Sequence, residues 1–415
     1  MKEQIIANLE NPKRLEALYR EDKASFRRSF AQLSPDLHDN KTVQIWHERL
    51  NFDNQEASWN LNKDLPFVFF LCLIAGLIAK IPHLTSVDPE YFYSRNVPFV
   101  VFPALTAFFI WKQHLFSIRQ ILGFATAFLI PAIYINLLPG NEKTDTFVLA
   151  CIHLPMLLWG ILGYIFIGGD NKDYTKKIDF LRFNGDFVVM TGLILIAGFI
   201  MTGMTIGLFS VIGIKIETYY FKYVGIWGLS AAPVIATYLV RSNPNIVGKV
   251  PPVIARMFAP IVLLILTVYL GTVFYTGKDP YNDREFLLIF NLLLVGVMAL
   301  ILFSVVEIAR KSADKIGTII LFALAVITIA VNSVALSAIM FRIANWGVTP
   351  NRLAVLGSNI LILAHLLVVT YQLFKTIGIP GRIENVKKSI TTFLPIYLVW
   401  TIIVIFVLPY LFGFK

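Results

Sequence analysis

The stretch Leu65–Ala79, with the sequence LPFVFFLCLIAGLIA, contains no charged residue. Uncharged runs of similar length cover residues 261–275 and 396–412. In hydrocarbon, only an α-helix or a closed β-barrel satisfies all of its backbone hydrogen bonds. Barrel strands alternate apolar and polar positions over about ten residues, whereas these runs are continuously apolar. They therefore predict transmembrane helices.

Along the chain we predict about eleven transmembrane helices, each long enough to cross the hydrocarbon core. They are expected at residues 65–83, 97–112, 118–139, 146–168, 185–211, 221–240, 254–276, 285–306, 316–341, 352–375 and 389–412. The second is short and contains Pro98 and Pro103, so a re-entrant segment, with ten spans in all, is the alternative. The expected fold class is all-α: a polytopic transmembrane helix bundle.

Composition supports this fold class. Of the 415 residues, 57% are hydrophobic and only 15% are charged, against roughly a quarter charged in soluble domains. Cys72 and Cys151 lie in apolar runs and suggest neither a disulfide framework nor a thiolate metal site. We predict no metal and no cofactor. The net charge of +10 is scattered over loops, which is untypical of nucleic-acid binding.

The first 64 residues are expected to form a short soluble helical segment before the transmembrane domain of residues 65–415. Asn11-Pro12 is a typical helix start, and an apolar stripe follows it at helical spacing: Leu15, Leu18, Tyr19, Phe26, Phe30 and Leu33. A second short helix is expected near Thr42–Leu50. Because so short a segment rarely stabilises a core alone, we expect residues 11–50 to dock on the membrane domain or on a protein partner.

The distribution of basic residues predicts the orientation. Ten lysines and arginines balance eleven acidic residues in the first 64 residues, whereas sixteen lie in loops on the N-terminal side of the spans and ten on the opposite side. Short basic loops stay in the cytoplasm. We therefore expect a cytoplasmic N-terminus and an external C-terminus. The charged N-terminus does not resemble a cleavable signal peptide, so the first apolar helix is expected to direct insertion.

Polar residues at membrane depth are the candidates for function, because they are costly there. His153 and His365 fall in the fourth and tenth predicted spans, where a neutral histidine can carry a proton or bind a ligand. Asn291, Asn332 and Asn359 fall in the eighth to tenth spans and could line a polar path. The alternative for all five is an ordinary hydrogen bond between helices. In the fifth span, Gly203 and Gly207 have the spacing that permits close helix packing, and a hinge or broken helix is the alternative.

A helix–loop–helix corner is predicted at residues 342–352, with the sequence RIANWGVTPNR. Gly347 permits a turn with positive φ, Thr349 can cap the next helix, and Pro350 suits its first position. Polar side chains flank this corner: Arg342, Asn345 and Arg352. They could bind an anionic group or a lipid headgroup, or the arginines could simply extend to the headgroup layer.

This corner resembles the Tyr-Gly-Leu-Thr-x-Asn-Arg type motif of the bacterial polytopic membrane family known as domain of unknown function 4153. The matching residues are Gly347, Thr349, Pro350, Asn351 and Arg352, with Arg342 before them. Trp346 replaces the usual tyrosine. The segment from Asp279 to Asn291 also looks like the loop before a span in that family. The resemblance covers roughly residues 60–415 and implies a bacterial inner-membrane protein of unassigned activity, with no catalytic residues to carry over.

Three functions are compatible with these observations. The sequence lacks the motifs of nucleotide-binding, zinc-protease and serine-hydrolase sites, so we expect a transporter-like or lipid-handling membrane protein. The alternative is a regulatory or scaffold subunit that docks a partner through residues 11–50. A membrane-embedded enzyme is the third possibility, and it would require catalytic groups that meet only in the folded protein.

Overall fold

The structure is a computed structural model, and it describes most of the transmembrane part of the chain. The residues it describes are 1–22, 25–26, 29–30, 40–46, 49–50, 64–113, 117–139, 144–211, 215–242, 259–260, 262–264, 266–267, 271, 281, 284–308, 315–377 and 383–414. Every regular element among them is a helix. The chain divides into two compact units, Met1–Leu65 and Pro66–Lys415, which are described separately.

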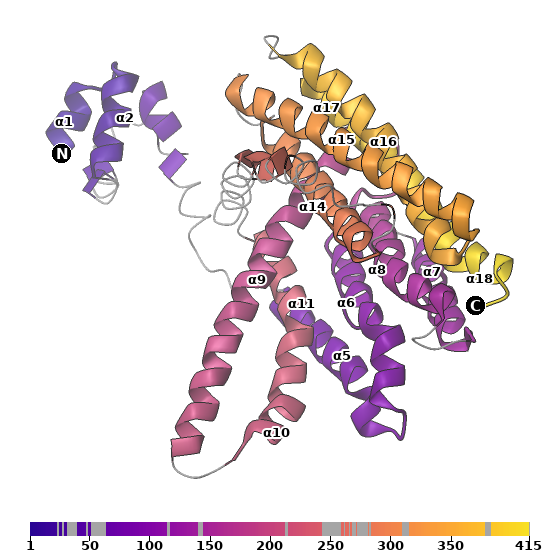
Figure 1. The fold of residues 1–415 in the computed structure, drawn as a ribbon. Helices are drawn as coiled ribbons and strands as arrows, with labels where there is room; N and C mark the ends of the chain where they lie inside the picture. Colours follow the sequence, from indigo (N-terminus) through magenta and orange to yellow (C-terminus); the bar gives the residue numbers. More distant parts are fainter. Residues whose placement is uncertain are drawn as a thin grey trace. The chain divides into compact units, whose positions relative to one another are not determined.

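Helices make up the second unit, and most of them are long (Figure 1). They are α5 (Leu65–Leu84), α6 (Pro89–Gln113), α7 (Ile118–Leu137), α8 (Asp145–Phe166), α9 (Tyr174–Val211), α10 (Glu217–Tyr220), α11 (Ile226–Ser242), α14 (Arg284–Ile308), α15 (Lys315–Trp346), α16 (Pro350–Thr376), α17 (Ile383–Ile402) and α18 (Leu408–Leu411). Two π-helical turns interrupt the series: η2 (Phe221–Gly225) joins α10 to α11, and η4 (Ile403–Val407) joins α17 to α18.

The all-α polytopic fold is confirmed. Nine helices in the described part are long and apolar enough to cross a membrane, and α14 contains a shorter apolar stretch, Leu294–Val305. Ten of the eleven predicted spans coincide with described helices, while the predicted span at 254–276 lies mostly outside the described residues. The second span is one continuous helix of 25 residues, long enough to cross the hydrocarbon core, which favours a full span over the re-entrant alternative.

Two sets of helices build the interior of this unit. α15 packs along α16, and α14 and α17 pack beside them, as Figure 1 shows. Their shared apolar core includes Ile301, Leu324 and Leu366, each of which is fully buried. α6, α8, α9 and α11 form the second set, whose core is rich in phenylalanine. The pocket described below lies where α14 meets this second set.

The start of α9 differs from its prediction. The fifth span was expected to begin at residue 185, but α9 begins at Tyr174 and runs for 38 residues. Its first turns are amphipathic: Ile178, Phe180 and Leu181 are buried, while charged residues at positions 176, 177, 179 and 182 lie on the more exposed side. In the sequence these turns look like a loop, because apolar residues occupy only about half of their positions.

Gly203 does not make the close contact predicted for it. Among the residues that the structure describes, a Cβ atom added at Gly203 would meet no other atom within 4 Å, and the same is true at Gly192 and Gly198. The packing interpretation is therefore wrong for Gly203, while the surroundings of Gly207 lie outside the described side chains. Close contacts occur instead at Gly76, which packs against Trp227, and at Gly357, which packs against Trp400.

The N-terminal unit has its own apolar core. Helices α1 (Lys2–Ala7) and α2 (Pro12–Glu21) begin it, and Asn11 caps α2 as predicted. The stripe residues described, from Leu15 to Phe30, are buried together with aliphatic and aromatic residues of the following helix: Val43, Trp46 and Leu50. The stripe is thus covered within the segment itself and needs no partner for its burial. Docking of a partner on residues 11–50 stays a prediction.

An ion-pair cluster lies on the surface of this unit. Arg20 and Arg49 each lie 2.8 Å from the Glu16 carboxylate. The hydrogen bond from Arg20, assisted by Arg49, lowers the pKa of Glu16. The guanidinium of Arg49 also lies 4.5 Å from the centre of the Trp46 ring. Arg49 therefore contacts both the Glu16 carboxylate at the surface and a tryptophan of the apolar core.

Candidate functional site

Three of the predicted polar residues meet at the contact of α14, α15 and α16. Asn332 Nδ2 donates to the backbone oxygen of Asn359 at 3.0 Å, and Asn359 Nδ2 donates to Asn291 Oδ1 at 3.0 Å. Asn332 and Asn359 are 0% and 2% exposed. Each bond joins two helices, which is the ordinary stabilising arrangement for amides in membranes. A role of these residues in a polar path stays a prediction.

His365 is fully buried on α16 and faces α17. Its Nδ1 lies 3.1 Å from the hydroxyl of Tyr397, and its ring stacks on Phe393 with 4.3 Å between centroids. Its Nε2 is buried and has no hydrogen-bond partner in the part of the chain that the structure describes. The two aromatic residues fix the imidazole plane, so the histidine is held rigidly between two helices.

His153 lies on α8 and is half-buried. Its Nδ1 is 2.8 Å from the backbone oxygen of Leu149 one turn earlier. Because a carbonyl oxygen only accepts, Nδ1 carries the proton in this contact. No interaction between His153 and His365 occurs among the described contacts, and no group of three or more His, Cys, Asp or Glu side chains placed to hold a metal ion occurs in the described ranges.

The predicted corner between α15 and α16 has the expected geometry. Gly347 has φ +76°, the Thr349 side chain accepts a hydrogen bond from the backbone of Arg352, and Pro350 begins α16. Arg352 Nη1 donates to the backbone oxygens of Trp346 at 2.8 Å and Gly347 at 2.7 Å. Arg352 therefore caps the end of α15, and this contact uses part of its hydrogen-bonding capacity.

The other two polar residues of the corner also make local contacts. The guanidinium of Arg342 lies 5.2 Å from the centre of the Trp346 ring, and Asn345 Nδ2 donates to the backbone oxygen of Phe341 at 3.0 Å. Trp346 itself is 49% exposed. The corner thus places two half-buried cations around one exposed indole ring. Binding of an anionic group or a lipid headgroup there stays a prediction.

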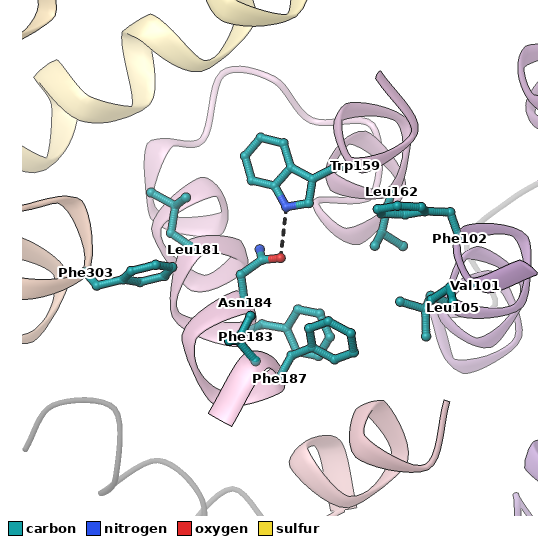
Figure 2. A pocket seen from close by; sticks show the side chains of 11 residues that line it. Val101, Phe102, Leu105, Trp159, Leu162, Leu181, Phe183, Asn184, Phe187 and Phe303 are labelled. Atoms are coloured by element: carbon teal, nitrogen blue, oxygen red, sulfur yellow. Dashed lines mark hydrogen bonds between the residues drawn. The ribbon is translucent and has the colours of Figure 1, made fainter. Parts of the chain in front are cut away.

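An apolar pocket of about 350 Å3 lies between α6, α8, α9 and α14 (Figure 2). Aromatic residues form much of its wall: Phe102, Trp159, Phe183, Phe187 and Phe303. Leucine and valine side chains form most of the rest. One lining residue, Val188, is 61% exposed, so the pocket reaches the outer surface of α9. None of these residues was a candidate from the sequence, because an apolar cavity leaves no polar pattern.

A single amide is the polar group in the pocket wall. Figure 2 shows the indole Nε1 of Trp159 donating to Asn184 Oδ1 at 2.9 Å. Asn184 Nδ2 donates in turn to the backbone oxygen of Phe180 at 2.6 Å. Both polar atoms of the amide are therefore engaged within the protein. The wall consequently presents a nearly apolar surface to any molecule in the pocket.

Asn184 and Asp186 are buried polar residues that sequence reasoning missed. They are 9% and 8% exposed and lie well inside α9, about 15–18 Å along the helix from Tyr174. The predicted span began at residue 185, which placed both at a membrane edge. The missed signal is the apolar pair Ile178 and Leu181, which are spaced one helical turn apart before them and extend the helix backward.

Two buried cations were also counted as loop charges. Lys80 on α5 is 5% exposed, and its Nζ lies 4.2 Å from the centre of the Tyr223 ring in η2. Arg95 on α6 is 6% exposed, and its guanidinium lies 3.9 Å from the Tyr91 ring and 4.3 Å from the Phe147 ring. Cation–π contacts of this kind are strongest where water is excluded. Both cations therefore stabilise contacts inside the helix bundle.

Comparison with known proteins leaves the chain without an assigned family. No protein-family model, no curated protein and no solved structure matches it. The resemblance to domain of unknown function 4153 therefore stays a prediction. The classification comes from the helices themselves, whose length and apolar composition suit a lipid bilayer. The chain is a multi-pass membrane protein.

Proposed function

We propose that this protein is a lipid-handling membrane protein that takes a hydrocarbon chain into the pocket between α6, α8, α9 and α14. The observation that carries this proposal is the apolar wall of that pocket, in which the polar atoms of Asn184 are already engaged by Trp159 and Phe180. A polar solute would lose hydrogen bonds to water and gain few in return. A hydrocarbon chain loses none.

The size and position of the pocket support the same occupant. A cavity of 150 Å3 lined by apolar residues is enough to bind benzene, and this pocket of about 350 Å3 is about twice as large. Lipid hydrocarbon surrounds a protein of this class at the depth of transmembrane helices. Because the lining residue Val188 is exposed on α9, an acyl chain can reach the pocket sideways from the bilayer.

The amide cluster on α14, α15 and α16 favours this function over a channel for polar solutes. Its three asparagines are joined to one another by hydrogen bonds across helices. A water-filled path needs polar atoms that face a cavity, and the pocket of the second helix set is apolar instead. The membrane we propose is the bacterial inner membrane, on the resemblance given above.

Fluorescence quenching by brominated lipids tests the proposal. Trp159 lines the pocket, so its emission should be quenched when a brominated acyl chain occupies it. The protein is reconstituted in phosphatidylcholine vesicles containing increasing fractions of dibrominated phosphatidylcholine. The Trp159 component of the emission is the difference between the spectra of the unmodified protein and of the Trp159→Phe variant. We expect this component to be quenched at a lower fraction of brominated lipid than the remaining tryptophans.

A matched pair of variants shows whether the pocket is responsible. Val101→Phe places a larger ring in the pocket wall, whereas Val97→Phe makes the same change one turn earlier on α6, where the side chain is 53% exposed. Val101→Phe should reduce Trp159 quenching at least about threefold, and Val97→Phe should leave it unchanged. Quenching that is equal in both variants, or equal for Trp159 and the other tryptophans, would reject acyl-chain binding in the pocket.

A further inference from the structure

Aromatic rings continue the pocket wall toward one end of the helix bundle. Phe109 on α6 and Phe166 on α8 lie one turn beyond the lining residues Leu105 and Leu162, about 6 Å along each helix. The ring of Phe183, which lines the pocket, lies 5.1 Å from Phe109 and 5.3 Å from Phe166. A packed aromatic core, in which Phe109 is fully buried, therefore connects the pocket wall to the ends of α6 and α8.

Arg241 stands at the end of this aromatic core. It is an exposed residue in the last turn of α11, and its guanidinium carbon lies 5.9 Å from the Phe109 ring centre and 5.6 Å from that of Phe166. Both distances are within the range of cation–π contacts. The positive charge is thus placed beside the aromatic end of the pocket wall and remains open to solvent.

A second arginine adds positive charge in the same region. Arg182 on α9 donates through Nη1 to Asp179 at 2.7 Å, and Asp179 also interacts electrostatically with Arg241. Two guanidinium groups and one carboxylate leave this cluster with one net positive charge. The surrounding helix ends and the turn after α8 carry four further basic residues, Lys112, Lys172, Lys176 and Lys177, and two carboxylates, Asp170 and Asp173. Lys176 pairs with Asp170 at 3.2 Å. The basic residues exceed the acidic ones by two, so this surface has a net positive charge that attracts anionic groups.

The cluster lies at the depth expected for lipid headgroups. α6 ends at Gln113, α8 at Phe166 and α11 at Ser242, so the contacts of Arg241 with Phe109 and Phe166 place three helix ends at one membrane surface. The pocket begins about one turn deeper, where acyl chains lie. Arginine side chains at such a surface form paired hydrogen bonds with phosphate oxygens.

We propose that the pocket selects lipids whose headgroup is an anionic phosphate, which Arg241 binds while one acyl chain enters between α6, α8, α9 and α14. This inference rests on the proposed function, because it assumes that a chain occupies the pocket. A phosphatidylglycerol headgroup carries the phosphate charge alone. Phosphatidylcholine adds a cation, which the net positive charge of Arg182, Arg241 and Asp179 disfavours.

The test compares two brominated lipids in the same vesicles. Dibrominated phosphatidylglycerol or dibrominated phosphatidylcholine is titrated into phosphatidylcholine vesicles that contain the full chain, and the midpoint of Trp159 quenching is measured for each. One arginine near an anionic lipid surface contributes about a fivefold preference. We therefore expect the midpoint for phosphatidylglycerol to be about fivefold lower, with high salt reducing the difference.

Three variants identify the residue responsible. Arg241→Gln should bring the two midpoints to within about twofold of each other, whereas Arg241→Lys should keep part of the preference because it keeps the charge. Arg119→Gln is the matched control: it removes an exposed charge from the first turn of α7, next along the chain after α6, and should keep the full preference.

The possible outcomes separate this inference from the proposed function. Equal midpoints in the unmodified protein, or an unchanged preference in Arg241→Gln, would overturn the selection of anionic headgroups while leaving chain binding in place. Loss of Trp159 quenching by both lipids in Arg241→Gln would mean that the arginine holds the fold rather than the headgroup, and it too would overturn the inference. Absence of quenching in the unmodified protein would reject the proposed function itself.

Discussion

Single polar side chains in this protein hold helices together at membrane depth. Asn359 is the central one: its backbone oxygen accepts a hydrogen bond from Asn332, and its amide donates to Asn291. Without such partners, each amide would be a buried polar group in hydrocarbon. Asn332 Oδ1 nevertheless has no hydrogen-bond partner among the described residues. The cluster is therefore stabilising while leaving one acceptor buried and unsatisfied.

Replacing this central amide should measurably weaken the helix contact. Asn359→Leu removes the bond to Asn291 but keeps a side chain of similar size, so we expect the free energy of unfolding in detergent to fall by about 1 kcal/mol. Asn345→Leu is the control, because Asn345 is exposed and its amide bonds within its own helix. Equal losses in both variants would show that the bond between Asn359 and Asn291 contributes nothing specific.

Pairs of helices meet where a tryptophan packs against a glycine. At Gly357 on α16 a Cβ atom would collide with the Trp400 ring of α17, and the Trp400 indole also donates to Ser358 Oγ at 3.1 Å. Gly76 on α5 has the same relation to Trp227 on α11. The missing side chain lets a large ring approach the helix backbone, and in the first pair a hydrogen bond fixes its orientation.

A methyl group at this contact should separate the two helices. Gly357→Ala forces the Trp400 ring to move, and overpacking of this kind costs about 2 kcal/mol of unfolding free energy. Thermal unfolding in detergent, followed by tryptophan emission, measures the change. Gly228→Ala on α11 is the control, because a Cβ there meets no atom within 4 Å. It should leave the protein as stable as before, or about 0.5 kcal/mol more stable.

The sequence predicts the helices better than it predicts their ends. Uncharged runs such as Leu65–Ala79 predict α5 directly. The corner at Gly347–Pro350 predicts the residue at which α16 begins after α15. The start of α9 is missed because its charged residues face away from the core while Phe180 and Leu181 are buried. An amphipathic first turn at a membrane surface has a composition close to that of a loop.

The residues of the candidate site also differ in how well the sequence predicts them. Spacing and chemistry select Asn291, Asn332 and Asn359, which the structure brings together. The pocket could not be selected, because packing determines where a space remains between apolar side chains, and packing depends on contacts far apart in the sequence. Phe102 and Phe303 line the same cavity although about 200 residues separate them.

The whole chain is expected to place its N-terminal unit in the cytoplasm and its C-terminus outside. The bias of sixteen basic residues against ten favours this orientation, and burial of Lys80 and Arg95 removes two charges from the loops of the opposite side. A C-terminal fusion to a reporter active only outside the cytoplasm should be active, and a fusion to one active only in the cytoplasm should be silent. The reverse pattern would show an inverted topology.

The length of α9 connects the pocket to the thickness of the bilayer. A helix of 38 residues is about 57 Å long, nearly twice the hydrocarbon core of about 30 Å, so it must tilt or extend beyond the membrane. Its third and fourth turns include the pocket residues Phe183 and Phe187, and its later turns carry the exposed side chains of Phe199 and Ile200. A thinner membrane would increase the tilt of α9, and both ends of the helix would tilt together. The part of the pocket wall that α9 provides would therefore shift when the thickness of the membrane changes.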